Sequence, residues 1–225
     1  MVRPPIGPNG PEWAGAERLK SGKGRTASER AWLERQLADP FAAKARALGY
    51  RSRAAFKLTE IDDRFRLISP RSRIIDLGCA PGGWLQVAHE RGAGALIGVD
   101  LLAVEPLAGA TLLQGDFTEP GCGERLLAAL GGRPDLILSD MAPNTTGHRR
   151  TDHLRIVALV EAAAEFASEA LQPGGAFLAK AFQGGETAEV VSRLKTRFAS
   201  VRHLKPKASR AESSELYLLA QGLRG

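Results

Sequence analysis

From residue 72 onward, short apolar runs alternate with longer stretches that have helical periodicity. The apolar runs cover residues 72–77, 95–100, 111–114, 136–140 and 176–182. The helical stretches lie near residues 83–91, 122–130, 153–171 and 186–198. This alternation is typical of a parallel sheet with helices on both faces. Two further apolar runs, 201–204 and 215–220, have no helix between them, so we expect them to pair antiparallel.

The sequence therefore predicts an α/β, Rossmann-like domain. Its sheet should have seven strands, mostly parallel, with an antiparallel last strand and helices on both faces. Three helices are expected before the sheet. The first can begin at Ser28 and the second at Asp39-Pro40. The third, over residues 52–65, has an apolar stripe at helical spacing. Lys57 lies next to this stripe on the predicted helix surface.

Length and composition favour one globular domain with a short extension. The chain has 225 residues, of which 44% are hydrophobic and 25% charged, and these values fit a single domain. Residues 1–26 combine Pro, Gly, Lys and Arg without apolar periodicity, so we expect a flexible basic extension there. Residues 27–225 would form the domain, with residues 27–70 as a helical appendage. We find no membrane-length apolar run and no secretory signal, and we expect a cytoplasmic protein.

Positive charge is concentrated near the N-terminus. The net charge of the chain is +6. Residues 1–57 contain 12 Lys or Arg and 5 Asp or Glu, whereas the remainder contains 19 Lys or Arg and 20 Asp or Glu. Such a distribution is expected if the N-terminal quarter binds a polyanion while the rest serves another purpose. A solvated basic tail is the alternative. The two cysteines, Cys79 and Cys122, form no CxxC pair, so no metal site is predicted.

Residues 74–84, Ile-Ile-Asp-Leu-Gly-Cys-Ala-Pro-Gly-Gly-Trp, are predicted to form a strand, a Gly-rich turn and the start of a helix. Nucleotide-like ligands bind at such turns in α/β sheets. A Walker A loop would need Lys and then Ser or Thr where Trp84 and Leu85 stand. A dinucleotide fingerprint would need Gly at Ala80, and Pro81 removes an amide, so NAD is the weaker alternative. The remaining ligand is S-adenosylmethionine, whose positive sulfonium needs acidic neighbours.

Acidic residues follow three successive predicted strands. Asp100 lies 22 residues beyond Gly78, the distance at which a carboxylate reaches ribose hydroxyls in a βαβ unit. Asp116 follows the third strand, where it can accept the amino group of adenine. Asp140 follows the fourth strand, at the sheet edge where ligands bind. A single strand-end Asp is more often a turn former, but three in succession favour a ligand site.

Lys180 stands inside an otherwise apolar run, Phe-Leu-Ala-Lys-Ala-Phe over residues 177–182. A buried ammonium loses hydration that only a partner or the loss of its proton can offset. We therefore expect Lys180 to have a chemical role. The alternative is a lysine whose amine reaches water at the strand end.

Five motifs occur in order along the chain: residues 51–58, 76–84, 114–117, 139–144 and 180–184. Together they resemble the FtsJ family of ribosomal RNA 2′-O-methyltransferases, over about residues 50–220. The resemblance implies a class I methyltransferase fold, S-adenosylmethionine as the cofactor, and a uridine of 23S ribosomal RNA in the large subunit as the substrate. Residues 1–26 lie outside the shared region.

The resemblance also implies site residues. In the family a Lys-Asp-Lys-Glu tetrad surrounds the target ribose, and it matches Lys57, Asp140, Lys180 and Glu215. By the same resemblance the cofactor contacts fall on Gly82, Trp84, Asp100, Asp116 and Asp140.

The chemistry of ribose methylation fits these residue types. A 2′-hydroxyl is a weak acid and the cofactor carries its own leaving group, so the protein must align the atoms and remove one proton. No metal is required. A lysine becomes a base more easily when it is partly buried beside a second ammonium. We assign Lys180 as the base and Asp140 as its orienting partner and a neighbour of the sulfonium. Lys57 and Glu215 are assigned as positioning residues.

RNA binding is expected at basic residues around this site and in the appendage, residues 27–70. The predicted contacts are Arg51, Arg53, Arg149, Arg150, Lys205 and Lys207. We expect a monomer that acts on ribosomal RNA. The alternatives are a transfer RNA ribose methyltransferase, a non-catalytic RNA-binding ribosome assembly factor and a small-molecule methyltransferase. The intact tetrad argues against a non-catalytic assembly factor. The basic N-terminal quarter argues against a small-molecule methyltransferase.

Overall fold

The computed structural model describes residues 39–143, 149–182, 187–210 and 213–225. The chain divides into two units, Met1–Asp39 and Pro40–Gly225. The predicted basic extension and the predicted helix at Ser28 lie outside the described residues. Among the described helices, none combines the length and the hydropathy that crossing a bilayer requires.

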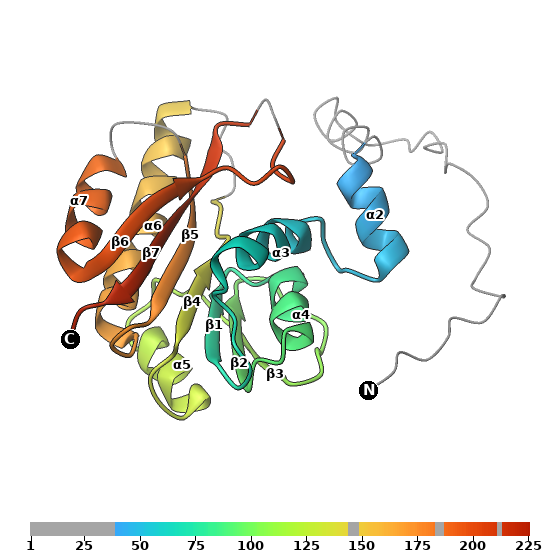
Figure 1. The fold of residues 1–225 in the computed structure, drawn as a ribbon, viewed down its shortest axis with the longest axis horizontal. Coiled ribbons are helices and arrows are strands. Elements are labelled where there is room, and N and C mark those ends of the chain that lie inside the picture. The colour runs from blue at the N-terminus through green and yellow to red at the C-terminus, as the bar shows by residue number, and fades with distance from the viewer. Residues whose placement is uncertain (1–38, 144–148, 183–186, 211–212) are drawn as a thin grey trace, which may run out of the picture. The chain divides into compact units, whose positions relative to one another are not determined.

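A seven-stranded sheet forms the centre of the second unit (Figure 1). In chain order its strands are β1 (Arg73–Leu77), β2 (Ala95–Asp100), β3 (Ala110–Gln114), β4 (Leu136–Ser139), β5 (Ala176–Phe182), β6 (Phe198–Leu204) and β7 (Glu215–Leu223). Their spatial order is β3-β2-β1-β4-β5-β7-β6, and β7 runs antiparallel to both of its neighbours. The predicted fold class is thus confirmed. The strand order reverses between β1 and β4, and ligands bind at such a reversal.

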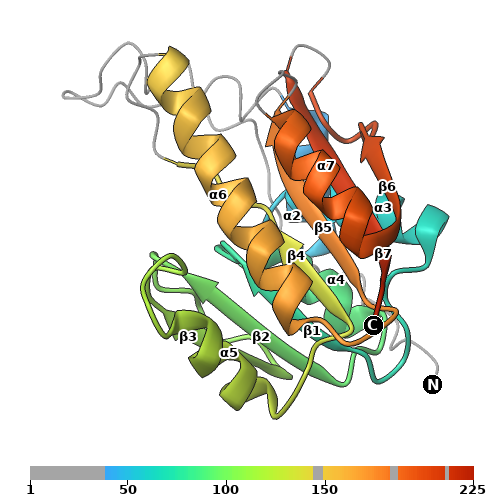
Figure 2. The same ribbon diagram turned by 90° about the vertical axis from the view of Figure 1, so that its left-hand side faces the viewer.

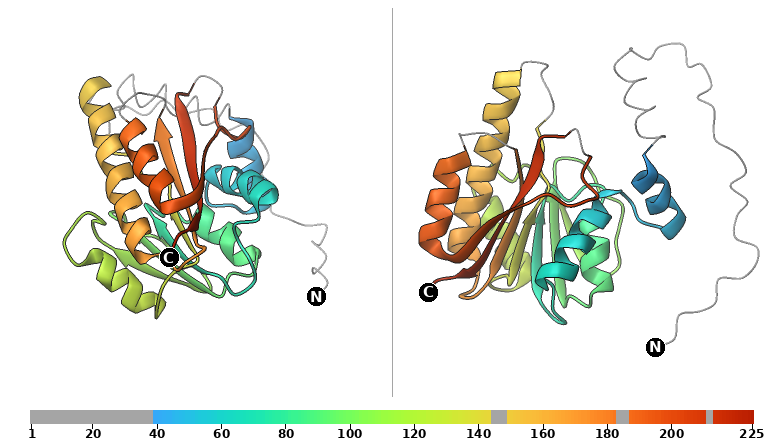
Figure 3. Two further views of the ribbon diagram at one scale, coloured as in Figure 1. Left: turned by 60° about the vertical axis from the view of Figure 1, so that its left-hand side comes forward. Right: turned by 45° about the horizontal axis from the view of Figure 1, so that its top comes forward.

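Helices cover both faces of the sheet, as Figures 2 and 3 show. The helices that pack on the sheet are α3 (Ala54–Phe65), α4 (Gly83–Glu90), α5 (Cys122–Leu130), α6 (Arg149–Ala170) and α7 (Ala188–Arg197). The helix α2 (Pro40–Leu48) contacts α3. The buried residues of α5, α6 and α7 share one hydrophobic core with one face of the sheet. Those of α3 and α4 share a second core with the opposite face.

The alternation of side chains along β5 separates these two cores. Phe177 and Ala179 belong to the core under α5, α6 and α7, whereas Leu178 belongs to the core under α3 and α4. Successive side chains of a strand point to opposite faces. Lys180 is two residues after Leu178, so its side chain points to the same face of the sheet, which α3 covers.

Several element boundaries differ from the predictions by a few residues. β6 begins at residue 198 rather than 201, and β7 continues to residue 223 rather than 220. The difference arises because Phe198 pairs with Leu223 and extends the antiparallel ladder. Pairing between segments far apart in sequence decides where a ladder ends, and a local hydrophobic pattern does not contain that information.

Candidate active site

Three polar residues lie side by side across neighbouring strands. Ser139 is paired with Ala179, so Asp140, which directly follows β4, comes next to Lys180. Lys180 is in turn paired with Tyr217 of β7. Paired residues of adjacent strands have their side chains on the same face. The sheet therefore brings Asp140, Lys180 and Tyr217 together beneath α3.

Lys180 and Asp140 form a double contact. The Nζ of Lys180 donates a hydrogen bond to the backbone oxygen of Asp140 at 2.5 Å and lies 3.1 Å from Asp140 Oδ1. The lysine side chain is 9% exposed and the aspartate side chain 21%. Asp140 is thus the partner that a buried lysine requires. The predicted pairing of these two residues is present.

The second lysine and carboxylate of the tetrad also form a pair. Lys57, on α3, places its Nζ 2.6 Å from Oε1 of Glu215, the first residue of β7. Both side chains are at most 15% exposed. The helix and the strand are separated by more than 150 residues in sequence, so only the fold brings this pair together.

Tyr217 connects the two pairs. Lys57 Nζ donates to the Tyr217 hydroxyl at 3.1 Å, and that hydroxyl donates to Asp140 Oδ1 at 3.0 Å. Burial, together with the negative charges of Asp140 and Glu215, raises the pKa of Tyr217, so its proton stays in place. Sequence reasoning assigned no role to this residue. Its spacing of two from Glu215, on the same face of one strand, is the signal that could have identified it.

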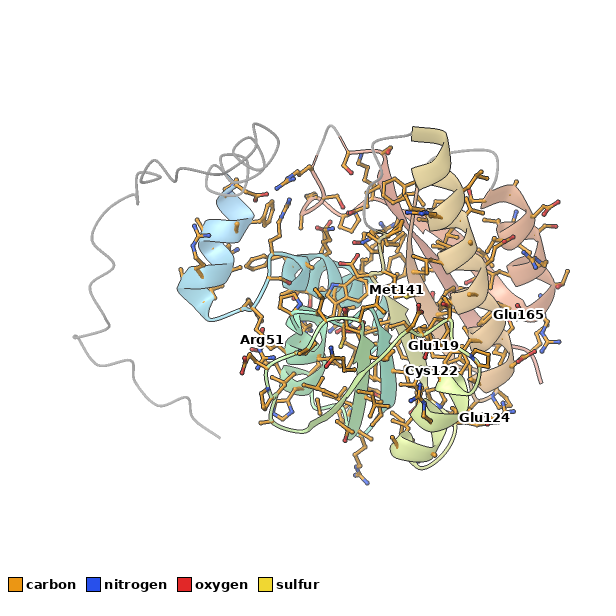
Figure 4. The ribbon with its side chains drawn as sticks, turned by 180° about the vertical axis from the view of Figure 1, so that it is seen from behind. Arg51, Glu119, Cys122, Glu124, Met141 and Glu165 are labelled. Atoms are coloured by element: carbon orange, nitrogen blue, oxygen red, sulfur yellow. The ribbon has the colours of Figure 1, made fainter. Side chains whose placement is uncertain are left out.

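A pocket of about 730 Å³ opens at the carboxyl ends of the strands beside this network. Asp100, Asp116 and Asp140 all line it. Asp140 thus belongs to both the pocket and the lysine network. The walls also contain apolar side chains that sequence reasoning did not single out: Leu101, Leu102, Phe117, Met141 and Leu159. Figure 4 shows Met141 near the centre of the domain.

Gly78 shapes the floor of the pocket. Its φ is +75°, which disfavours residues with a side chain, and a Cβ there would come within 2.5 Å of Met141 Cγ. The Gly-rich turn that follows β1 therefore needs glycine at this position both for its backbone conformation and for the space that Met141 occupies.

Asp100 links two backbone segments of the pocket. Its Oδ2 accepts a hydrogen bond from the amide of Ala80, in the Gly-rich turn, and its Oδ1 accepts one from the amide of Leu102. The alternative role of turn former is thus observed for Asp100, and its contact with a ligand stays a prediction. Each carboxylate oxygen has a second lone pair, which remains for a ligand hydroxyl.

Asp116 lies at the far side of the pocket, after β3. Its Oδ1 accepts hydrogen bonds from both the hydroxyl and the amide of Thr118. These two donors lower the pKa of Asp116. The carboxylate is therefore ionised and held in place, as an acceptor for an amino group must be.

A further carboxyl group is buried below the pocket. Asp76, in β1, is 1% exposed, and neither side-chain oxygen has a hydrogen-bond partner among the described residues. Burial raises its pKa well above the ordinary value, and the nearby charges of Asp140 and Asp100 raise it further. Asp76 thus holds a proton at pH values at which an exposed aspartate has lost it.

Two of the predicted cofactor residues do not line the pocket. Trp84 is buried, donates its indole N–H to the backbone oxygen of Ala54 at 2.8 Å, and packs against the ring of Tyr217. Gly82 is the residue before α4 and has a φ of +106°. Trp84 thus joins α4 to α3 and β7, and the predicted contact of both residues with a cofactor stays a prediction.

The predicted RNA contacts lie on several separate elements, and Arg53, which precedes α3, donates to the backbone oxygen of Ala208. The Arg51 guanidinium donates to the backbone oxygens of Pro81, Glu105 and Pro106, and Figure 4 shows the residue at the side of the domain. Lys207 is exposed, as is Lys205, whose Nζ donates to a backbone oxygen. The side chains of residues 149 and 150 lie outside the described part of the chain. RNA binding by this set stays a prediction.

Comparison with known proteins identifies relatives along the whole chain. The family model described as FtsJ-like methyltransferase matches residues 50–223. A protein of Caulobacter vibrioides named ribosomal RNA large subunit methyltransferase E is 63% identical over 225 residues, which is all of both chains. A protein of the same name from Granulibacter bethesdensis is 57% identical, with 99% of this chain and 95% of the relative covered. The resemblance predicted from five motifs is confirmed.

A solved structure shares the fold. A crystal structure from Plasmodium falciparum, described as that of a ribosomal RNA methyltransferase, superposes with a TM-score of 0.70 at 30% sequence identity. The match covers 78% of this chain and all of the other. The predicted sheet topology and the predicted family thus agree with independent comparisons of structure and of sequence.

Proposed function

The chain belongs to the FtsJ-like methyltransferase family, and from that premise we propose that it methylates a ribose 2′-hydroxyl of ribosomal RNA with S-adenosylmethionine as the donor. The target proposed is a uridine of 23S ribosomal RNA in the large subunit. One observation carries the proposal: two lysine–carboxylate pairs, joined through a tyrosine hydroxyl, lie beside an acidic pocket.

The pocket suits a positively charged adenosine derivative. Its volume of about 730 Å³ is within the usual range for small-molecule sites. Among the described lining residues, Arg155 is the one cationic side chain, whereas three carboxylates face the same space. We assign Asp100 to the ribose hydroxyls, Asp116 to the adenine amino group and Asp140 to the neighbourhood of the sulfonium. When bound, S-adenosylmethionine supplies a methyl group activated by its sulfonium.

Lys180 is the proposed base for the target hydroxyl. A neutral amine has two N–H donors and one lone pair. The two acceptors that Asp140 presents, its backbone oxygen and Oδ1, match the two donors. The lone pair of Nζ is then left to take the proton of the 2′-hydroxyl.

Lys57, Glu215 and Tyr217 are proposed to position the other participants. The Lys57–Glu215 pair fixes one side of the hydroxyl of Tyr217, and Tyr217 in turn holds Oδ1 of Asp140. Asp140 is therefore restrained from two directions, by Lys180 and by Tyr217. A fixed carboxylate keeps the base aligned, which is the main requirement of a reaction limited by alignment.

Ribosomal RNA is favoured as the substrate over transfer RNA by the names of the relatives. A cytoplasmic location and a monomeric state are part of the same proposal, as is RNA binding by the basic N-terminal residues. A net positive charge of +7 over residues 1–57 supports that binding.

The experiment that tests this function is a map of 2′-O-methylation across total RNA from cells with and without the gene. We expect one ribosomal position to lose its methyl group and to regain it on expression of the wild-type protein but not of Lys180→Ala. Loss of methylation in transfer RNA alone, or no loss in any RNA, would contradict the proposal.

A further inference from the structure

We propose that Glu60 is a positioning residue, which holds the loop segment after β6 (residues 205–210) against α3 and thereby keeps Glu215 beside Lys57. This inference deepens the proposed function and rests on it, because it assigns a role to a residue outside the tetrad. It follows from a series of contacts that runs from Glu60 on α3, through residues 207–209 and Glu215, back to Lys57 on α3.

Two polar residues of α3 and the arginine before it share the side of the helix that faces this loop. Arg53 directly precedes the helix, and Lys57 and Glu60 follow it at spacings of four and seven residues. Residues at these spacings lie on one face of a helix. The lysine of the tetrad is thus flanked on its own face by one arginine and one glutamate.

Glu60 and Arg53 both bind the backbone of the loop. The Glu60 carboxylate accepts hydrogen bonds from the amides of Lys207, at 3.0 Å, and Ala208, at 3.3 Å. Arg53 donates to the backbone oxygen of Ala208 at 2.5 Å. Ala208 is 1% exposed, so its peptide groups depend on these protein partners rather than on water.

The loop then reaches the tetrad through Ser209. Its hydroxyl donates to Oε1 of Glu215 at 3.0 Å, and this is the oxygen that also accepts from Lys57 Nζ at 2.6 Å. Ser209 is 8% exposed and its amide donates to Pro206, which closes a tight turn. A displacement of residues 207 and 208 would therefore move the hydroxyl that holds Glu215.

The carboxylate is essential to this arrangement because the loop presents two donors. Glutamine has nearly the same shape as glutamate but only one acceptor oxygen, and its amide group would face a backbone N–H. Glu60→Gln should thus release one of the two amides while leaving the helix intact. A hydrogen bond to a charged acceptor changes an equilibrium by more than about 10-fold where it is fully buried, but Glu60 is only half-buried, so a smaller change of about 3- to 10-fold is expected here.

The test compares Glu60→Gln with Asp63→Asn. Asp63 is on the same helix, but its carboxylate binds Arg91 at 2.5 Å. Steady-state methylation of ribosomal RNA, S-adenosylmethionine affinity and melting temperature are measured for both variants. We expect kcat of Glu60→Gln to fall about 3- to 10-fold with unchanged cofactor affinity. Asp63→Asn should keep the wild-type kcat.

A double-mutant cycle with Ser209→Ala separates positioning from a general loss of stability. If Glu60 acts through Ser209, the double variant loses less activity than the product of the two single losses. Multiplicative losses, or a wild-type kcat in Glu60→Gln, would overturn the inference. Wild-type protein that methylates no ribosomal RNA would instead contradict the proposed function, so the two failures are distinct.

Discussion

Lys180 is bound to Asp140 twice, because its Nζ donates to the backbone oxygen of Asp140 and also lies 3.1 Å from Oδ1. The position of the lysine therefore does not depend on the carboxylate alone. Removal of the amine and removal of the carboxylate should consequently have different effects, since only the first deletes the group that we propose takes the proton.

We predict that Lys180→Ala lowers the methylation rate by about 10²- to 10⁴-fold, the usual effect of removing a general base. Cofactor affinity should be nearly unchanged, because Lys180 does not line the pocket. Single-turnover methylation and calorimetry with S-adenosylmethionine provide the two measurements. A variant that keeps more than about a tenth of the wild-type rate would exclude Lys180 as the base.

Asp100→Ala should weaken the binding of S-adenosylmethionine. The substitution removes acceptors for ribose hydroxyls and also releases the amides of Ala80 and Leu102, each of which loses a charge-assisted bond of about 1.5–3 kcal/mol. Asp100→Asn, which keeps one acceptor oxygen, is the matched control and should bind with intermediate affinity. If calorimetry finds the affinity of Asp100→Ala unchanged, the cofactor ribose lies elsewhere.

Asp76 should make the stability of the protein depend on pH. Its pKa is raised in the folded state above the ordinary value of 3.8, so the folded protein binds more protons than the unfolded chain at higher pH. The contribution of Asp76 to the free energy of unfolding is therefore fully present below pH 3.8 and is lost as the pH rises toward the pKa of the folded state. Asp76→Asn removes this dependence.

The variant Asp76→Asn should accordingly gain stability relative to the wild type as the pH rises, by up to about 1.4 kcal/mol per pH unit. Denaturant unfolding without cofactor at several pH values from about 5 to 8 measures the difference in the free energy of unfolding. A difference that stays constant across this range would show that Asp76 titrates normally in the folded protein.

Deletion of residues 1–26 should leave cofactor binding intact but weaken RNA binding and reduce its salt dependence. This segment contains five Lys or Arg and two Glu. Each lost phosphate contact lowers the slope of log K against log salt by about 0.7–0.9. RNA titrations at several salt concentrations compare the truncated and full chains. Equal affinity and equal slope would leave the RNA contacts to the remaining basic residues.

Much of the fold and the tetrad could be predicted because their signals are local. Each strand with the helix that follows it, the Gly-rich turn, and the acid at the end of each of β2, β3 and β4 are patterns that span about thirty residues or fewer. Lys180 was conspicuous because a charged residue interrupts an apolar run. Five motifs in order then identified the family, and with it Lys57 and Glu215.

The parts that could not be predicted depend on contacts between distant segments. Tyr217 reads as an ordinary aromatic of a buried strand. Its spacing of two from Glu215 places it on the same face as that residue, but the pairing of β5 with β7 is needed to show that it lies next to Lys180. Glu60 reads as a charged residue of a solvated helix face, yet it binds a loop about 150 residues away. Neither the register of the sheet nor the docking of a loop is encoded in a local pattern.

The most direct test is the identity of the methylated nucleoside. Purified protein is incubated with ribosomal RNA from cells that lack the gene and with S-adenosylmethionine carrying a labelled methyl group, and the RNA is then digested to nucleosides. We predict label in 2′-O-methyluridine with the wild-type protein and none with Lys180→Ala. Label in a base-methylated nucleoside, or equal labelling by the two proteins, would contradict ribose methylation by this site.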